Sequence, residues 1–173
     1  MNEVIKSLKE RRSIRKYKPD MVPKELIDEV IEAGLYAANS RSDQTAIVIA
    51  VTQKEWRDKL EALNSKFTNG QAHPFYGAPV VLVVLAKTDR PAQYCDGCLV
   101  MGNLMQAAHS VGLGSCWIHR AKEVFETEEG KALLKELGIE GDYIGVGHCI
   151  LGYMDGALPE APARKEDRVF YVK

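Results

Sequence analysis

The spacing of hydrophobic residues along the chain predicts which segments form helices and which form strands. Apolar residues three or four positions apart, such as Leu26 and Val30 after Pro23, are typical of a helix with one buried face. The run Pro79–Ala86 has no polar residue, which predicts a strand covered on both faces. The pattern predicts five helices. The first covers about residues 2–10, the second begins at Pro23, and the third has Trp56, Leu60, Leu63 and Phe67 on one face. The last two cover Asp96–Val111 and Glu123–Leu137. It predicts strands at Ile47–Thr52, Pro79–Ala86, Ser115–Ile118 and Tyr143–Leu151, with a short β-prone end at Val169–Val172.

The order of these elements indicates the fold class. Helices and strands are mixed without the strict strand–helix alternation of a parallel sheet, which indicates an α+β fold. The helix at Asp96–Val111 is apolar nearly all round, so we expect it in the middle of the fold. The chain has no internal repeat, low-complexity segment or Pro/Ser-rich linker, and residues 1–173 are therefore expected to form a single domain.

The charge balance excludes some classes of partner. A net charge of −1 leaves no overall field that would recruit nucleic acid or an anionic membrane. Residues 1–24, however, contain eight Lys or Arg against three acidic residues, which predicts a local anion site. The first ten residues lack the apolar run of a signal peptide, and the uncharged stretch Gly97–His119 is too polar for a membrane span. We therefore expect a cytoplasmic protein whose four cysteines are reduced.

Common catalytic motifs are absent. Gly145-Val146-Gly147 is similar to a dinucleotide-binding fingerprint, but the third glycine is missing and the segment is predicted to be a strand. The sequence contains no P-loop, HExxH or GxSxG motif. The four histidines share no recognisable pattern with an acid or a nucleophile.

The four cysteines suggest packing more than chemistry. Cys95 and Cys98 have the CxxC spacing of a redox motif or of half a zinc site. No second CxxC exists, and no histidine has ligand spacing to the pair, so we favour packing of both side chains at the start of the buried helix. Cys116 and Cys149 lie in apolar strand patterns and are expected in the core.

Two basic clusters lie at opposite ends of the chain. One is Arg11-Arg12-Ser13-Ile14-Arg15, directly after the first helix, and the other is Arg164-Lys165, after a Pro-rich stretch. Guanidinium groups with a neighbouring hydroxyl suit the oxygens of a phosphate monoester. From the residues alone, such clusters are more often solvated surfaces than phosphate sites.

Three segments resemble the nitroreductase family. Arg11–Tyr17 is similar to its opening FMN-binding signature, and Asn103–Ile118 to its central helix and following strand. Ile150–Val169, with Pro162-Ala163-Arg164-Lys165, is similar to its C-terminal signature. The segments keep the family order and span almost the whole chain. The resemblance implies a central mixed or antiparallel sheet flanked by helices, in a homodimer whose subunits exchange their C-terminal strands.

The resemblance also implies two FMN sites at the subunit interface, each lined by both chains. Arg11 and Ser13 would face the phosphate and ribityl chain with Arg12 beside them, and Arg15 would approach the pyrimidine edge of the flavin. Cys116–Ile118 would run along the ring and offer mainly backbone groups. The residues assigned to FMN in this way are Arg11, Arg12, Ser13, Arg15, Asn39, Ser40, Ser42, Gln44, Cys116, Trp117, Ile118, Arg164 and Lys165.

One family element is altered in this sequence. The usual Pro-Ser-x-x-Asn-x-Gln-Pro after the second helix is Ala38-Asn39-Ser40-Arg41-Ser42-Asp43-Gln44-Thr45 here. Gln44 is retained, Asn39 and Ser42 replace the serine and the asparagine, and both prolines are lost. Asn39 and Ser42 can still donate and accept hydrogen bonds, so the loop is expected to touch the flavin.

The activity implied by the resemblance is ping-pong oxidoreduction. NAD(P)H would reduce FMN, and a nitroaromatic or quinone-type acceptor would then take the electrons. Because FMN carries the chemistry, no catalytic acid, base or nucleophile is expected. The segment between Phe67 and Tyr76 is expected to form the rim of the acceptor pocket. Two alternatives remain open: a flavin carrier or sensor without NAD(P)H turnover, and a small thiol or metal module built on the CxxC.

Overall fold

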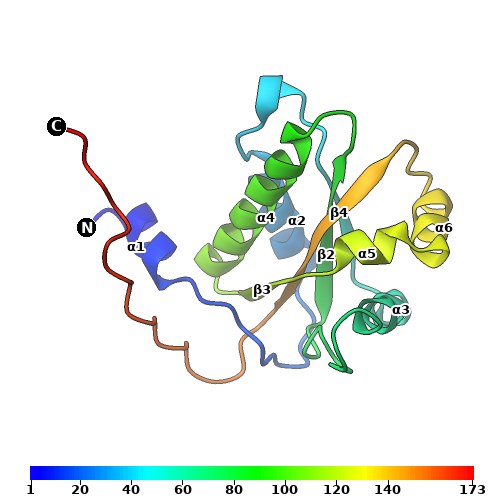
Figure 1. Ribbon diagram of the computed structural model, residues 1–173. Coiled ribbons are helices and arrows are strands. Elements are labelled where there is room, and N and C mark those ends of the chain that lie inside the picture. Colours follow the sequence, from blue (N-terminus) through cyan, green and yellow to red (C-terminus); the bar gives the residue numbers. More distant parts are fainter.

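The computed structural model describes residues 1–173, and its centre is one antiparallel sheet of four strands (Figure 1). The strands lie in the order β1-β2-β4-β3, and each neighbouring pair is antiparallel. This confirms the predicted α+β class and decides between a mixed and an antiparallel sheet. The strand bounds are β1 Ile47–Val51, β2 Val80–Lys87, β3 Gly114–Ile118 and β4 Tyr143–Gly152, each within one residue of prediction.

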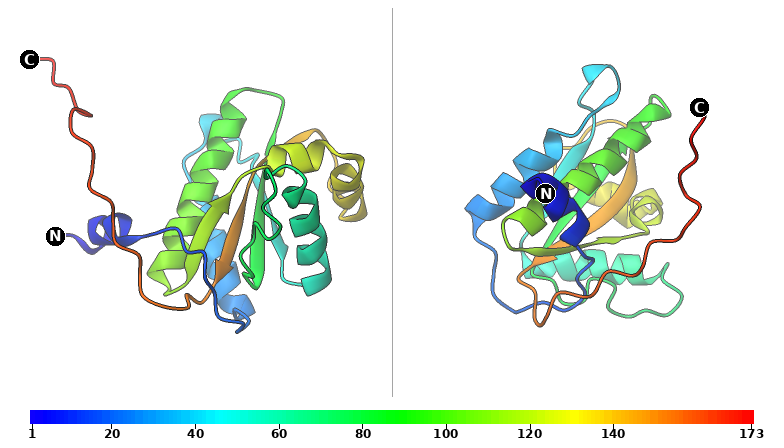
Figure 2. Two further views of the ribbon diagram at one scale, coloured as in Figure 1. Left: turned by 60° about the horizontal axis from the view of Figure 1, so that its bottom comes forward. Right: turned by 90° about the vertical axis from the view of Figure 1, so that its left-hand side faces the viewer.

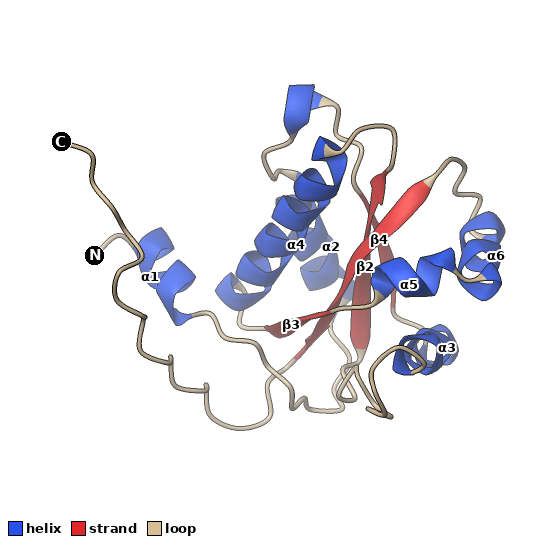
Figure 3. Ribbon diagram, in the orientation of Figure 1, coloured by secondary structure: helices blue, strands red, loops and turns tan.

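Helices cover both faces of the sheet (Figure 3). α2 and α4 pack on one face, and α3, α5 and α6 pack on the other. α1 lies apart from these layers, beside the C-terminal half of α4 (Figures 1 and 2). The helix bounds are α1 Glu3–Glu10, α2 Lys24–Leu35, α3 Lys54–Ser65, α4 Ala92–Ser110, α5 Ala121–Glu126 and α6 Glu128–Glu136, with the short 3-10 helix η1 at Ser40–Ser42.

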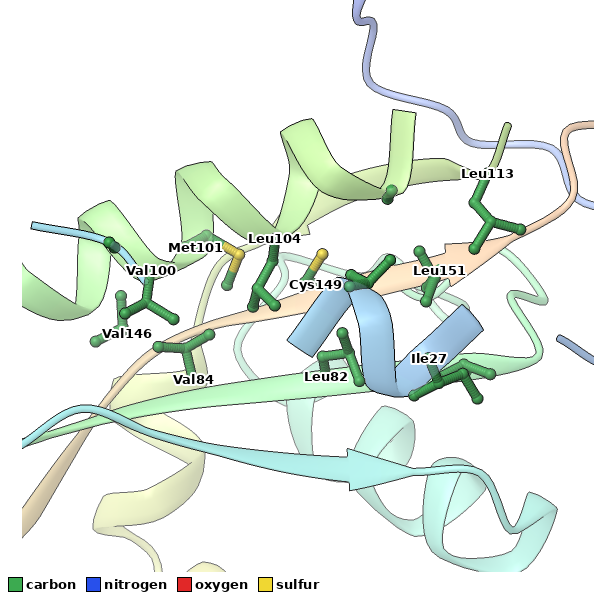
Figure 4. Packing of buried hydrophobic residues seen from close by; sticks show 14 of the residues in the cluster. Ile27, Leu82, Val84, Val100, Met101, Leu104, Leu113, Val146, Cys149 and Leu151 are labelled. Carbon is green, nitrogen blue, oxygen red and sulfur yellow. The ribbon is translucent and has the colours of Figure 1, made fainter. Parts of the chain in front are cut away.

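Strand β2 divides the hydrophobic core into two clusters. Every residue of Val80–Ala86 has no exposed surface, which confirms the prediction from its unbroken apolar run. Leu82 and Val84 point toward α2 and α4, where they meet Ile27 and Leu104 (Figure 4). The alternate side chains Val81, Val83 and Leu85 enter the opposite cluster with α3, α5 and α6.

The predicted helix Glu123–Leu137 is wrong in one respect, because it is two helices with a break at Thr127. The Thr127 hydroxyl accepts a hydrogen bond from the Gly130 N–H at 3.0 Å and thereby begins α6. Gly130 also lies against the Val124 carbonyl, where a Cβ atom would come within 2.2 Å. The chain turns here because a glycine lets the two helices approach each other.

Helix α4 also differs from prediction. It begins at Ala92, four residues before the expected start, and one of its sides is not covered by this chain. Leu99 is 49% exposed, and Gly102 and Asn103 are exposed one turn further on. The predicted central position therefore holds for one face only.

The C-terminal tail was predicted to end in a β-prone segment, but it forms no strand within this chain. After β4 it runs away from the sheet (Figures 1 and 2), and Val169–Val172 are between 69% and 103% exposed. No segment of the chain covers these four apolar side chains.

The cysteines are partly as predicted. Cys116 and Cys149 are buried in the core, and burial raises the pKa of the Cys149 thiol to about 12. Cys98 packs against the core, but Cys95 is exposed, so the packing prediction is wrong for Cys95. None of the helices combines the length and the apolar character that crossing a membrane requires.

One buried histidine leads to a prediction about acid stability. His148 has no exposed surface, lies between Phe75 and Phe125, and accepts a hydrogen bond at Nδ1 from the Asn64 amide at 3.2 Å. Burial lowers its pKa from 6.5 to about 4. The folded protein favours the neutral ring, whereas the unfolded chain binds a proton at about pH 6.5. The free energy of unfolding therefore has its full value above pH 6.5 and decreases as the pH falls toward 4.

We expect His148→Leu to flatten the acid side of the stability profile. Between pH 7 and pH 4 the unmodified protein should lose about 3 kcal/mol of unfolding free energy that the variant keeps. Urea unfolding followed by tryptophan fluorescence at several pH values measures both curves. Parallel curves would mean that His148 does not control acid unfolding.

Candidate functional site

The candidate site begins where the segment after α1 lies along the sheet. The Ile14 N–H donates to the Ser115 carbonyl of β3 at 2.9 Å. Further along, the Lys18 N–H donates to the Tyr153 carbonyl at 2.9 Å. Residues 11–18 therefore lie between the outer edge of β3 and the chain that leaves β4. The C-terminal tail therefore leaves β4 next to the N-terminal basic cluster.

The two chain ends enclose a hollow of about 770 Å³. Five of its ten lining side chains are Lys or Arg, and none is acidic. The structure thus brings Arg11, Arg12, Ser13 and Arg15 together with Arg164, an arrangement that only the family resemblance had implied. Lys165 is exposed on the tail and does not line the hollow. The lining residues are Leu8, Lys9, Arg11, Arg12, Ser13, Arg15, Pro159, Ala161, Pro162 and Arg164.

Arg11 and Arg12 differ in how they are held. One terminal nitrogen of Arg12 donates to the carbonyls of Lys9 and Arg11, both at 2.7 Å. The Arg12 side chain thus caps the C-terminus of α1. Arg11 is half-buried, and its Nη1 is buried without a hydrogen-bond partner. A buried guanidinium nitrogen with no acceptor is costly unless a ligand supplies one. Nε of Arg12 is likewise buried without a partner, but a terminal nitrogen of Arg12 is already bonded to the carbonyls at the end of α1, so Arg11 is the stronger phosphate candidate of the two.

Strand β3 forms the wall next to this cluster. Cys116 is buried, while Trp117 and Ile118 are half-buried, so side chains of this strand face the core more than the hollow. Trp117 lies over Gly147, where a Cβ atom would come within 2.2 Å of its indole nitrogen. Since the Ser115 carbonyl points outward to Ile14, the two-residue alternation of a strand also directs the backbone groups of Trp117 outward. Beyond the pairing at Ser115, the strand thus offers the backbone groups of Trp117 at its outer edge.

Arg15 has a neighbour that sequence analysis did not identify. Its guanidinium carbon lies 6.0 Å from the ring centre of Tyr76, within range of a cation–π interaction. Tyr76 belongs to the segment predicted to be the acceptor rim. The contact places that segment beside the basic cluster, although nothing in the spacing of the two residues indicated it.

The loop at residues 38–45 lies elsewhere on the chain. Asn39 and Gln44 line a separate hollow of about 180 Å³ together with Thr45 and Asp96. The Asn39 Oδ1 accepts from the Gln44 N–H at 3.1 Å, and its amide donates to the Ala37 carbonyl at 3.3 Å. The Asn39 side chain is thus engaged within its own loop.

Ser40 and Ser42 of the same loop have different surroundings. Ser40 is held by Asp96 of α4, and Ser42 is exposed. The buried Asp96 was missed as a site residue. A single carboxylate in a helix with no other acidic or basic residue besides a histidine is a sequence signal of a fixed polar partner.

A single chain does not bring the loop and the basic cluster together. The loop contacts α4 at Asp96, whereas α1 contacts the same helix at Gln106. Ten residues of helix separate these contacts, which is about 15 Å at the usual rise per residue. The predicted FMN residues therefore form two groups at different ends of α4 (Figure 1).

Comparisons with known proteins agree with this architecture. The sequence profile described as the Nitroreductase family matches residues 8–71 and 62–153. The crystal structure of a nitroreductase with bound FMN from Bacteroides fragilis has a TM-score of 0.88 to this chain, with 26% identity and 100% coverage of both chains. The fold is therefore the nitroreductase fold.

Two curated relatives extend the match. A protein of Archaeoglobus fulgidus whose name includes NAD(P)H nitroreductase is 30% identical over 157 residues, 88% of this chain and 86% of that protein. The FMN reductase [NAD(P)H] of Bacillus subtilis is 33% identical over 138 residues, 66% of this chain and 53% of that protein. The match thus spans about half the length of the Bacillus relative. The chain belongs to the nitroreductase family.

Proposed function

We propose that this protein is an FMN-dependent oxidoreductase that uses NAD(P)H as electron donor. The observation that carries the proposal is the cationic hollow, where five basic side chains, no acid and an unpartnered buried nitrogen of Arg11 suit a phosphate dianion. An FMN-bound neighbour and an NAD(P)H-dependent relative support the same cofactor and donor. We also propose a cytoplasmic location, because reducing conditions would keep the four cysteines as free thiols.

The residues of the hollow would divide the work of holding FMN. Arg11 and Arg164 would bind the phosphate, with the Ser13 hydroxyl beside them and Lys165 supplied by the tail. Arg15 is exposed at the far end of the cluster, where it would approach the pyrimidine edge and stabilise negative charge there. The outward backbone groups of Trp117 would contact the ring.

FMN, when bound, supplies the electron-transfer chemistry, and the protein needs no catalytic acid, base or nucleophile of its own. The chain's residues would bind the cofactor, orient it and keep one ring face open to reactants. We propose that NAD(P)H and the acceptor use this face in turn, with nitroaromatics or quinones as acceptors. Tyr76 and the segment before it would form the rim that selects between acceptors.

A complete site would require two copies of the chain. The loop at Asn39–Gln44 and helix α1 contact α4 at points about 15 Å apart, so we propose that a second copy supplies one of the two groups that contact each flavin. The uncovered apolar surfaces support this arrangement. No residue of α1 is buried, and an eight-residue helix is not stable unless its apolar face packs. Val4, Ile5 and Leu8 of α1 and Leu99 of α4 are about half exposed or more.

Gly102 adds to the case for a dimer. It lies on the exposed side of α4 with no atom within 4 Å of a built Cβ position. A glycine in a helix interior costs stability unless something approaches closely. A second α4 crossing at this position would use that space, with two-fold symmetry as the usual arrangement.

The C-terminal tail has one free sheet edge to join. The outer edge of β3 already pairs with Ser13, but the outer edge of β1 has no partner within the chain. The seventeen residues 157–173 can span about 55 Å when extended, enough to reach a second copy. We propose that Val169–Val172 of each subunit pairs with β1 of the other.

The visible spectrum of the purified protein tests the proposed function. A yellow protein should lose its flavin absorbance at about 450 nm when NADH or NADPH is added without oxygen, because electrons then reach the bound flavin. Addition of a quinone should then restore the colour. A yellow protein that neither nucleotide bleaches would instead be a flavin carrier or sensor, and a colourless protein that does not bind added FMN would refute the proposal.

A further inference from the structure

The buried carboxylate of Asp96 makes two hydrogen bonds to one residue of the loop. It accepts from the Ser40 backbone N–H at 2.9 Å and from the Ser40 hydroxyl at 2.7 Å. Asp96 is only 5% exposed and forms no ion pair. A buried carboxylate without a cation needs such donors, so both oxygens are committed to Ser40.

The loop that Asp96 holds has an unfavourable backbone. Arg41, Ser42 and Gln44 all have positive φ angles, of 54°, 58° and 50°. Side chains with a Cβ adopt this region at a cost, and three cases in four residues persist only when the surroundings enforce them. The conformation therefore depends on what anchors the loop.

A second contact holds the other half of the loop near the N-terminus of α4. Arg90, just before α4, forms an ion pair with Asp43. Asn39 and Gln44, which flank the anchored residues Ser40 and Asp43 in the sequence, line the hollow of about 180 Å³. The Thr45 hydroxyl in that lining is buried and has no partner, as expected of a group that awaits a ligand.

We propose that Asp96 is a positioning residue that holds the 39–44 loop in the shape that binds the cofactor. This inference rests on the proposed function, since it assumes that the loop contacts FMN. Asp96 would not touch the flavin. It acts through Ser40, whose position sets the direction of the strained turn and hence of Gln44.

Variants at position 96 separate hydrogen bonding from charge and from packing. Asp96→Asn keeps one acceptor for the Ser40 N–H and offers an amide to its hydroxyl, so it should bind FMN within about threefold of the parent. Asp96→Ala removes both bonds and should raise the FMN dissociation constant about tenfold. Gln93→Leu is the matched control, because Gln93 is buried one turn away and its side-chain amide has no hydrogen bond.

The second measurement does not depend on FMN. Arg41 is exposed within the loop, and trypsin cleavage after it reports how well the loop is held. In flavin-free protein, Asp96→Ala should be cut there about tenfold faster than the parent, while Asp96→Asn and Gln93→Leu should be cut at nearly the parent rate. If Asp96→Ala does not fold, Ser40→Ala removes one of the two bonds and should show a smaller change of the same kind.

The outcomes separate this inference from the proposed function. A parent protein that fails to bind FMN would refute the proposed function, and the inference with it. A parent that binds FMN, together with an Asp96→Ala variant of unchanged affinity and cleavage, would overturn only the role of Asp96. If Asp96→Asn is as impaired as Asp96→Ala, the hydrogen-bonding explanation is wrong.

Discussion

Arg11→Ala and Arg164→Ala should each weaken FMN binding by about tenfold or more, because hydrogen bonds to charged groups contribute roughly 1.5–3 kcal/mol. The Arg11 guanidinium has a buried nitrogen without a partner, and Arg164 comes from the opposite end of the chain to line the same hollow. Titration of flavin-free protein, followed by quenching of FMN fluorescence, measures both effects.

Riboflavin makes this test specific for the phosphate. It has the same ring and ribityl chain as FMN, so neither substitution should change riboflavin binding appreciably. Lys16→Ala is the control for lost positive charge, because Lys16 lies in the same segment but forms an exposed ion pair with Asp155. Equal loss of FMN and riboflavin affinity would show that the substitutions disturb the fold and that the phosphate lies elsewhere.

Deletion of Val169–Lys173 should weaken the dimer and lower FMN occupancy together. These residues include the four most exposed apolar side chains of the tail, and the outer edge of β1 is unpaired. Loss of the exchanged strand would uncover that edge and release the segment that carries Arg164 and Lys165. Sedimentation and flavin absorbance of one preparation measure both properties.

Phe170 is the tail residue that we expect to be buried against the other subunit. An apolar hollow of about 220 Å³ lies beside β1, lined by residues that include Ile49, Trp56 and Leu133. A large aromatic side chain buried there would contribute strongly to association. Phe170→Ala should therefore weaken the dimer nearly as much as the deletion, whereas removal of Lys173 alone should have little effect. A fully flavinated dimer without residues 169–173 would show that the tail is not exchanged.

Much of the fold follows from local patterns in the sequence. The unbroken apolar run Val80–Ala86 requires cover on both faces, and the helices on the two sides of the sheet provide it. The apolar spacing of α2 predicted which of its faces is buried. The break at Thr127 was missed because it depends on the close approach of Gly130 to the backbone of α5, and this contact is visible only in the structure. Boundaries of this kind depend on contacts between elements.

The candidate site shows the same division. The sequence by itself determined the basic clusters, the absence of catalytic motifs and the resemblance to the nitroreductase family, because these depend on residue types in order. Only the tertiary structure decided that Arg164 returns to Arg11, that Asn39 is engaged within its own loop and that Asp96 anchors that loop. These contacts join residues far apart in the chain, and their geometry is set by the pairing of β3 and β4 and by the packing of α4 on the sheet.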